Sequence, residues 1–249
     1  MREAKVRPDG SRIRWVEIAG AEPARVYLHG LGASSAPYFA AAVADPTLVG
    51  RRSLLVDLLG HGISDRPVDA GYTLEDHADW VATALDVAGV RDAEVIGHSM
   101  GGAVAIVLAA RHPRLVGRLL LVDANLDPYP PGHRGIAARW TEDEFVHGDG
   151  RERHLRRVGR HWAATMRLAG PEALYRSALH LGRGTTPSMR ELLVGLEIPR
   201  AYLHPAGAAP DDVAGLVAAG VEVVAVPDCG HNIMLDNPEA FVAAVRGWK

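Results

Sequence analysis

Ser99 lies in the run GHSMGG, residues 97–102, and it is the residue of this chain best placed to act as a nucleophile. A β-type run at residues 92–96 precedes it, and a helix-type run at residues 103–112 follows it. A glycine-flanked serine at a strand-to-helix corner is typical of a nucleophile elbow, in which a strained turn lifts the hydroxyl clear of the sheet. Gly97 and Gly101 leave room for this turn, because a β-carbon there would meet the neighbouring strand and helix.

A serine hydroxyl becomes a good nucleophile only when a base accepts its proton, and a histidine base needs a carboxylate that fixes its tautomer. His231 is the predicted base. It follows the last predicted strand, and Gly230 would let its loop bring the imidazole over the sheet edge. The chain has 12 histidines, so any one of them taken alone would be interpreted as a surface residue. The position of His231 before a capped terminal helix favours the catalytic interpretation.

Acyl transfer also requires backbone N–H groups where negative charge develops on the substrate oxygen. The first predicted donor is the amide of Met100, the residue after the nucleophile, and the second is the amide of Leu31. Leu31 lies in the sequence HGLG, residues 29–32, where glycines on both sides let the backbone approach a substrate. A glycine-rich turn without chemistry is the alternative. A dinucleotide site is disfavoured, because the third glycine of that motif is missing.

Short apolar runs alternate with amphipathic ones, and this alternation must position the chemical groups. Seven runs predict strands, at residues 11–18, 24–29, 52–57, 94–97, 118–123, 200–204 and 221–226. The central runs are continuously apolar, as in parallel strands covered on both faces. Residues 74–88 follow helical spacing with Thr73 as N-cap, and Asn237 with Pro238 begins a last helix. The alternation predicts a parallel sheet with right-handed crossovers.

The alternation breaks between about residues 125 and 197, where no convincing strand occurs. We expect a helical insertion over one end of the sheet, with a single apolar helical stripe at residues 155, 158, 162 and 166. Its aromatic residues either line a substrate pocket or form the insertion's own small core, and the sequence leaves both open. These residues are Tyr129, Trp140, Phe145 and Trp162.

Composition excludes several classes of function. The chain has 249 residues, of which 48% are hydrophobic and 23% charged, as in ordinary globular proteins. A net charge of −3 creates no field that would recruit nucleic acid or an anionic membrane. We find no 18-residue apolar run, no signal-peptide core near the start, no metal-ligand spacing and only one cysteine. These features predict a cytoplasmic enzyme that uses neither a metal nor a cofactor.

Four motifs follow one another along the chain, at residues 29–32, 57–65, 97–102 and 230–231, and their order is more specific than any one of them. In this order the chain resembles the α/β-hydrolase fold family, of the single-domain esterase, lactonase and cofactor-free haloperoxidase type. The resemblance covers almost the whole chain and is weakest over residues 125–197. It implies an α/β fold with an eight-stranded, mostly parallel sheet, helices on both faces and a helical cap after the sixth strand. Residues 1–124 and 198–249 would then form the core and residues 125–197 the cap.

The resemblance also implies a Ser–acid–His triad, and the acid is where the sequence departs from the commonest family pattern. The region after the seventh strand, residues 203–212, carries a proline where an aspartate is expected shortly after a glycine. Asp211 and Asp212 come later and look like first-turn acids of the next helix, a position that the helix dipole favours. Asp123 ends the sixth strand, and a carboxylate there points into the same crevice as the serine and the histidine. Asp123 is therefore the predicted acid, with Asp211 and a loop-capping role for Asp123 as the alternatives.

The predicted function is hydrolysis of an ester, thioester or lactone through an acyl-enzyme on Ser99, with a small-molecule substrate that carries a mostly apolar acyl group. The same triad could instead support hydrolysis of a C–C bond, perhydrolysis or haloperoxidation. The fold could also serve as a small-molecule receptor without turnover, because a fold does not determine chemistry. His98, inside the elbow, is expected to pack or hydrogen-bond beside the serine, since adjacent side chains point apart.

Overall fold

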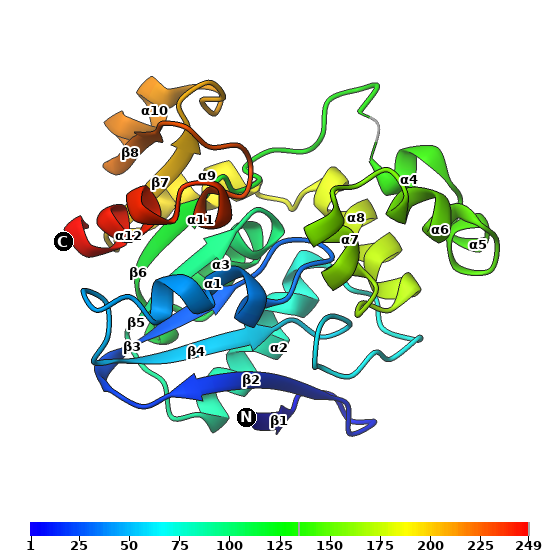
Figure 1. The fold of residues 1–249 in the computed structure, drawn as a ribbon, viewed down its shortest axis with the longest axis horizontal. Helices are drawn as coiled ribbons and strands as arrows, with labels where there is room; N and C mark the ends of the chain where they lie inside the picture. Colours follow the sequence, from blue (N-terminus) through cyan, green and yellow to red (C-terminus); the bar gives the residue numbers. More distant parts are fainter. Residues whose placement is uncertain (134, 249) are drawn as a thin grey trace.

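Eight strands form a single sheet in a computed structural model that describes residues 1–133 and 135–248 (Figure 1). The spatial order is β1-β2-β4-β3-β5-β6-β7-β8. Strands β3 to β8 run parallel to one another, whereas β2 is antiparallel to both β1 and β4. The bounds are β1 Arg2–Lys5, β2 Arg12–Ile18, β3 Ala21–Leu28, β4 Arg51–Asp57, β5 Ala93–His98, β6 Val116–Val122, β7 Arg200–Pro205 and β8 Val221–Val226. The predicted fold class is confirmed.

Strand β1 was not among the seven runs identified from the sequence. It lies at the edge of the sheet, and of its four residues only Ala4 is buried. An edge strand with one covered position needs no apolar run, so hydrophobic pattern alone does not reveal it.

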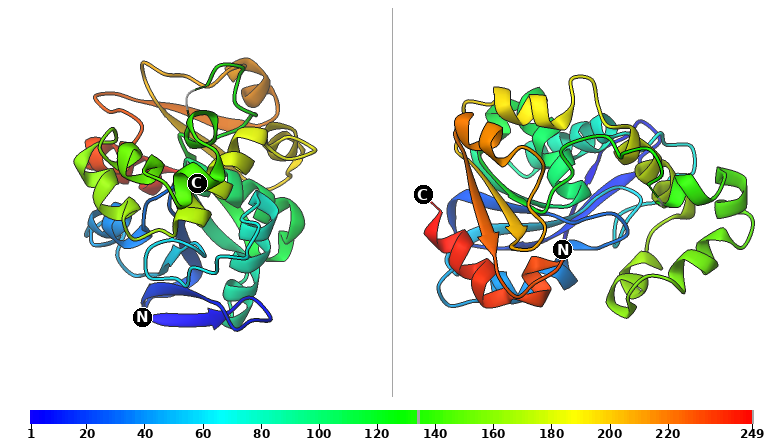
Figure 2. Two further views of the ribbon diagram at one scale, coloured as in Figure 1. Left: turned by 90° about the vertical axis from the view of Figure 1, so that its right-hand side faces the viewer. Right: turned by 90° about the horizontal axis from the view of Figure 1, so that it is seen from above.

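Helices cover both faces of the sheet (Figure 2). One face carries α1, α11 and α12, which pack with the sheet in one apolar cluster. The other face carries α2, α3, α9 and α10, whose buried residues join a second and larger cluster. Their bounds are α1 Ser35–Val43, α2 Leu74–Val87, α3 Met100–Arg111, α9 Met189–Gly195, α10 Val213–Ala218, α11 Ile233–Asp236 and α12 Pro238–Gly247, with a 3₁₀ turn, η1, at Pro113–Leu115.

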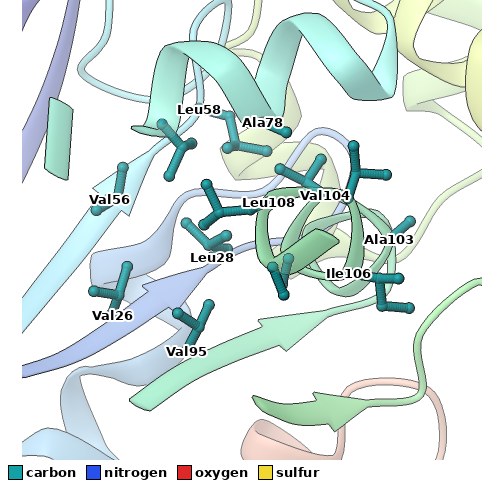
Figure 3. Close-up of a cluster of buried hydrophobic side chains, with 14 of the residues drawn as sticks. Val26, Leu28, Val56, Leu58, Ala78, Val95, Ala103, Val104, Ile106 and Leu108 are labelled. Carbon is teal, nitrogen blue, oxygen red and sulfur yellow. The ribbon is translucent and has the colours of Figure 1, made fainter. Parts of the chain in front are cut away.

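Helix α3, which follows the serine, is apolar all round because it lies in the centre of this larger cluster. Leu108 of α3 lies beside Leu28 of β3, and Val104 lies on the side of α3 that faces Ala78 of α2 (Figure 3). Ten consecutive residues of α3 are buried. The elbow is therefore mounted on the most deeply buried helix of the fold, which gives the serine a rigid support.

Helix starts follow the signals in the sequence. The side chain of Thr73 accepts a hydrogen bond from the amide of Asp76, and the Asp76 carboxylate accepts one from the amide of Thr73. Asn237 accepts from the amide of Ala240, with Pro238 at the first helical position of α12. Both predicted helix starts are confirmed.

The segment between β6 and β7, residues 123–199 and here called the β6–β7 segment, is helical within its described part and extends beyond one end of the sheet (Figure 2). It contains α4 Ile136–Arg139, α5 Glu142–Val146, α6 Gly150–Leu155, α7 Arg160–Met166, α8 Pro171–Arg183 and α9. Nine buried residues from α4 to α8 form a third apolar cluster, whereas α9 packs against α3 in the main core. The segment thus has a small core of its own.

The expected single stripe in this segment is wrong in one respect. Leu155 ends α6, and Trp162 and Met166 belong to the next helix, α7. Gly159, in an extended conformation, is the N-cap of α7 and separates the two helices. Leu155 and Met166 still enter the same cluster, because two short helices can converge on one core as well as one long helix can.

Among the residues that the structure describes, none of the helices has both the length and the apolar character needed to cross a bilayer.

Four fully buried histidines make the stability of the fold sensitive to acid. Burial lowers the pKa of His77 and His98 to about 3, and it also lowers the pKa of His29 and His61. A histidine in the unfolded chain titrates near pH 6.5, so the unfolded chain binds more protons below that pH. The free energy of unfolding should therefore fall as the pH drops from 6.5 toward 4, by about 1.4 kcal/mol per pH unit for each of His77 and His98.

Urea unfolding of the wild type and of His77→Gln between pH 6.5 and 5 measures this effect. The variant should show a shallower loss of stability with falling pH, since one buried group no longer titrates. Equal slopes for the two proteins would contradict the account.

Candidate active site

The serine stands on a strained turn between β5 and α3. Ser99 has φ 51° and ψ −122°, a left-handed conformation that is uncommon for a residue with a side chain. A β-carbon on Gly97 would lie 2.6 Å from the carbonyl oxygen of Gly101, and one on Gly101 would lie 2.4 Å from that of Leu28. The run GHSMGG adopts this turn because glycines stand where the chain passes closest to itself.

The predicted base and the predicted acid are in contact. His231 Nδ1 lies 2.6 Å from Asp123 Oδ2, so the imidazole donates this proton and its Nε2 is left to accept one. Asp123 directly follows β6, and its own amide donates to the carbonyl of Leu203 in β7 at 2.8 Å. The backbone of Asp123 has φ 44°, which turns the chain out of the sheet at this point. The carboxylate is thus held at the carboxyl edge of the sheet, near the end of β5 that carries Ser99.

His98 supports the loop that carries His231. Its Nε2 lies 2.9 Å from the backbone carbonyl of His231, while its buried Nδ1 has no partner among the described residues. Burial is the main cause that lowers the pKa of His98 to about 3, and the neighbouring His231 lowers it further. His98 is therefore neutral, with its proton on Nε2 as the donor. As expected from the sequence, it hydrogen-bonds beside the serine.

The hydroxyl of Ser99 faces an amide side chain that the sequence analysis did not identify. Ser99 Oγ lies 3.4 Å from Asn125 Oδ1, and Asn125 Nδ2 lies 3.5 Å from the hydroxyl of Tyr129. Both contacts are long and therefore weak. Ser99 and His231 line the same cavity, although no hydrogen bond joins them in the described part of the chain. Such contacts often tighten only when substrate binds.

The amides of Leu31 and Met100 are the predicted oxyanion donors. Met100 is the first residue of α3, and Leu31 lines the cavity that Ser99 also lines. Neither N–H donates to another described residue. The amino end of α3 adds a positive dipole at the same place.

The alternative acid, Asp211, makes no hydrogen bond or ion pair with His231 in the described part of the structure. Asp211 is exposed and precedes Asp212, the N-cap of α10, whose carboxylate accepts from the amide of Gly215 at 3.0 Å. Both acids contribute to a raised pKa of Arg190, whose main cause is a hydrogen bond with Asp127. The two acids thus stand at the start of α10, but at the N-cap and one residue before it rather than in the first turn as expected.

A cavity of about 560 Å³ opens beside the serine, between the β6–β7 segment and the core. Tyr129 and Trp162 line it. Phe145 belongs to the third apolar cluster, and both Trp140 and Trp162 pack against that cluster. The aromatic residues of this segment therefore serve both expected purposes: some line the cavity, and some form the segment's own core. The wall is mostly apolar and includes Leu31, Ile136 and other aliphatic side chains. No aspartate or glutamate is among the described residues that line it.

Sequence reasoning missed Asn125, although a signal was present. Asn125 stands two residues after Asp123, at the carboxyl end of a parallel strand, where side chains meet a ligand crevice. The search for an acid drew attention to Asp123 alone. The described residues also contain no cluster of three or more histidine, cysteine or acidic side chains suited to a metal ion.

Comparison with known proteins agrees with this architecture. A family model described as alpha/beta hydrolase fold matches residues 24–189, more than half of the chain. Among solved structures, a thermophilic esterase from Thermogutta terrifontis has a TM-score of 0.79 and 22% sequence identity, and the match covers 100% of this chain and 98% of that one. At this level of identity the likeness concerns the fold.

Curated relatives differ in activity. A protein of Mycobacterium phage D29, named "Putative non-heme haloperoxidase", is 29% identical over 219 residues, which cover 81% of this chain and 77% of that protein. A 2-hydroxymuconate semialdehyde hydrolase from Pseudomonas putida is 39% identical over 98 residues, which cover 38% of this chain and 34% of that protein. The chain thus spans about a third of the length of the first curated relatives that it matches.

Proposed function

Because this chain belongs to the α/β-hydrolase fold family, we propose that it is a serine hydrolase that cleaves a carboxylic ester, thioester or lactone. Ser99 is the nucleophile, His231 the general base and Asp123 the acid that orients the base. The observation that carries this proposal is the 2.6 Å contact between His231 Nδ1 and Asp123 Oδ2, which leaves Nε2 free to accept a proton.

The reaction follows from these roles. Ser99 Oγ attacks the acyl carbon while His231 Nε2 accepts the hydroxyl proton. The amides of Leu31 and Met100 bind the oxyanion of the tetrahedral intermediate. When the intermediate collapses, the bond to the leaving group breaks and His231 returns the proton to it. Water, activated by the same histidine, then attacks the acyl-enzyme and releases the carboxylic acid and free Ser99.

The cavity supports a mostly apolar acyl group. Its aliphatic and aromatic wall excludes water from the acyl chain, which favours burial by about 25 cal/mol per Å² of apolar surface. A cationic acyl group would find no carboxylate among the described lining residues, so neutral or anionic substrates fit better. In this proposal residues 125–197 act as the cap over a core of residues 1–124 and 198–249.

A second reaction on the same triad is hydrolysis of a C–C bond, which the similarity to the Pseudomonas putida hydrolase favours. Perhydrolysis or haloperoxidation is a further alternative because of the phage relative. A further alternative is a receptor that binds a small molecule in this cavity without hydrolysing it.

A substrate panel separates these possibilities. Nitrophenyl esters of increasing acyl length, simple lactones and a vinylogous C–C substrate are offered to the wild type and to Ser99→Ala. Ester or lactone turnover that Ser99→Ala lacks is expected. Turnover of the C–C substrate alone would favour the second reaction. Binding of panel members without turnover would indicate a receptor, and hydrolysis that persists in Ser99→Ala would refute the nucleophile.

A further inference from the structure

Helix α7 of the β6–β7 segment is hydrogen-bonded to the loop that carries one of the proposed oxyanion donors. The indole Nε1–H of Trp162 donates to the carbonyl oxygen of Leu31 at 2.7 Å. Building on the proposed function, we propose that Trp162 is a positioning residue, which holds the backbone of Leu31 so that its amide faces the developing oxyanion. The bond is short and links residues 131 positions apart in the chain.

The loop needs such a support because glycines flank Leu31 on both sides. Gly30 and Gly32 give the backbone wide freedom, and Gly32 adopts φ +68°. The inner end of the loop is fixed by His29, whose Nδ1 donates to the carbonyl of Gly30 and whose Nε2 accepts from the amide of Leu58. No comparable bond from the sheet reaches the carbonyl of Leu31 in the described residues. Its partner comes from α7.

Packing on Gly32 confirms that this loop rests against the β6–β7 segment. A β-carbon on Gly32 would lie 2.7 Å from Met166 Cε and 3.2 Å from Leu174 Cδ2. Leu31 itself packs against the third apolar cluster, to which both side chains belong. The outer side of the loop is therefore covered by α7 and α8, and its position depends on how these helices sit.

The residue before Trp162 makes a matching contact with the loop of the proposed base. His161 Nε2 lies 3.1 Å from Asn232 Nδ2, and Asn232 directly follows His231. Helix α7 thus contacts both loops through consecutive side chains. It braces the oxyanion donor and the base relative to one another, as a preorganised site requires.

Replacing Trp162 with phenylalanine tests the proposal, because the ring keeps contact with the cavity while the N–H donor is lost. We expect kcat for a good ester substrate to fall by about 10-fold, with KM changed by less than about threefold, since the oxyanion forms only in the transition state. The affinity of an alkyl boronic acid, whose tetrahedral Ser99 adduct places an oxygen at the oxyanion site, should fall by a similar factor.

Trp140→Phe is the matched control, because Trp140 packs against the same cluster and does not line the cavity. It should leave kcat, KM and boronate affinity within about twofold of the wild type. Thermal unfolding of both variants separates a general loss of stability from an effect on the site. A Trp162→Phe enzyme with a raised KM but unchanged kcat and boronate affinity would reduce Trp162 to a wall of the cavity and overturn the proposal. A wild type that neither turns over esters nor binds boronate would instead refute the proposed function.

Discussion

Changing Asp123 to asparagine is expected to lower kcat for ester hydrolysis by about 10³- to 10⁴-fold. The carboxylate accepts the Nδ1 proton of His231 at 2.6 Å, which fixes the tautomer and stabilises the imidazolium that forms when Ser99 is deprotonated. An asparagine amide can donate to Nδ1 and so favour the wrong tautomer, with its proton on Nε2. Steady-state kinetics of the purified variant measure the loss.

Asp211→Asn is the matched control for this change. Asp211 is exposed and lies beside the N-cap of α10, so its loss should change kcat by less than about twofold. The two variants remove the same charge, so general electrostatics cannot explain a difference between them. If Asp211→Asn were the more damaging change, Asp123 would not be the acid.

Changing Gly101 to alanine is expected to lower both stability and activity. The new β-carbon would lie 2.4 Å from the carbonyl oxygen of Leu28 and 2.5 Å from that of His29, both of which are backbone atoms. To remove this steric clash, the end of β3 must move away from α3, which should lower the free energy of unfolding by about 3 kcal/mol. The same movement displaces the loop that carries Leu31, so kcat should fall as well. Urea unfolding and steady-state kinetics measure the two effects.

Gly195→Ala serves as the control for glycine replacement. A β-carbon on Gly195 meets no atom within 4 Å, and the residue ends helix α9. Alanine there should leave activity unchanged and leave stability equal or slightly higher, because alanine is the better helix former. A Gly101→Ala protein as stable and active as the wild type would show that the close approach at the elbow does not constrain the fold.

Sequence patterns predicted the sheet well because parallel strands are continuously apolar. The run at residues 221–226 coincides with β8, and the others differ from the observed strands by a few residues at their ends. The edge strand β1 escaped because only Ala4 of its residues is buried. Pattern reasoning thus succeeds where a strand carries an apolar run, as the edge strand β8 does, and fails for β1, whose sequence REAK has none.

The candidate site was predicted less evenly. Ser99 and His231 stand in motifs whose neighbouring glycines indicate a tight backbone turn. Asp123 was chosen because it lies at the end of a strand. Their roles stay predictions until measured. Contacts made by the β6–β7 segment, such as that of Trp162 with Leu31, depend on how short helices dock on the core. The spacing of residues along the sequence does not predict how these helices pack on the core.

Intact-mass analysis after incubation with a fluorophosphonate tests the central claim most directly. The probe phosphonylates a serine only when a neighbouring base activates it. We predict prompt addition of one phosphonyl group, located on Ser99 by peptide mapping. The adduct should be absent in Ser99→Ala and strongly slowed in His231→Gln. An unmodified wild-type protein, or a label on any other residue, would contradict the account.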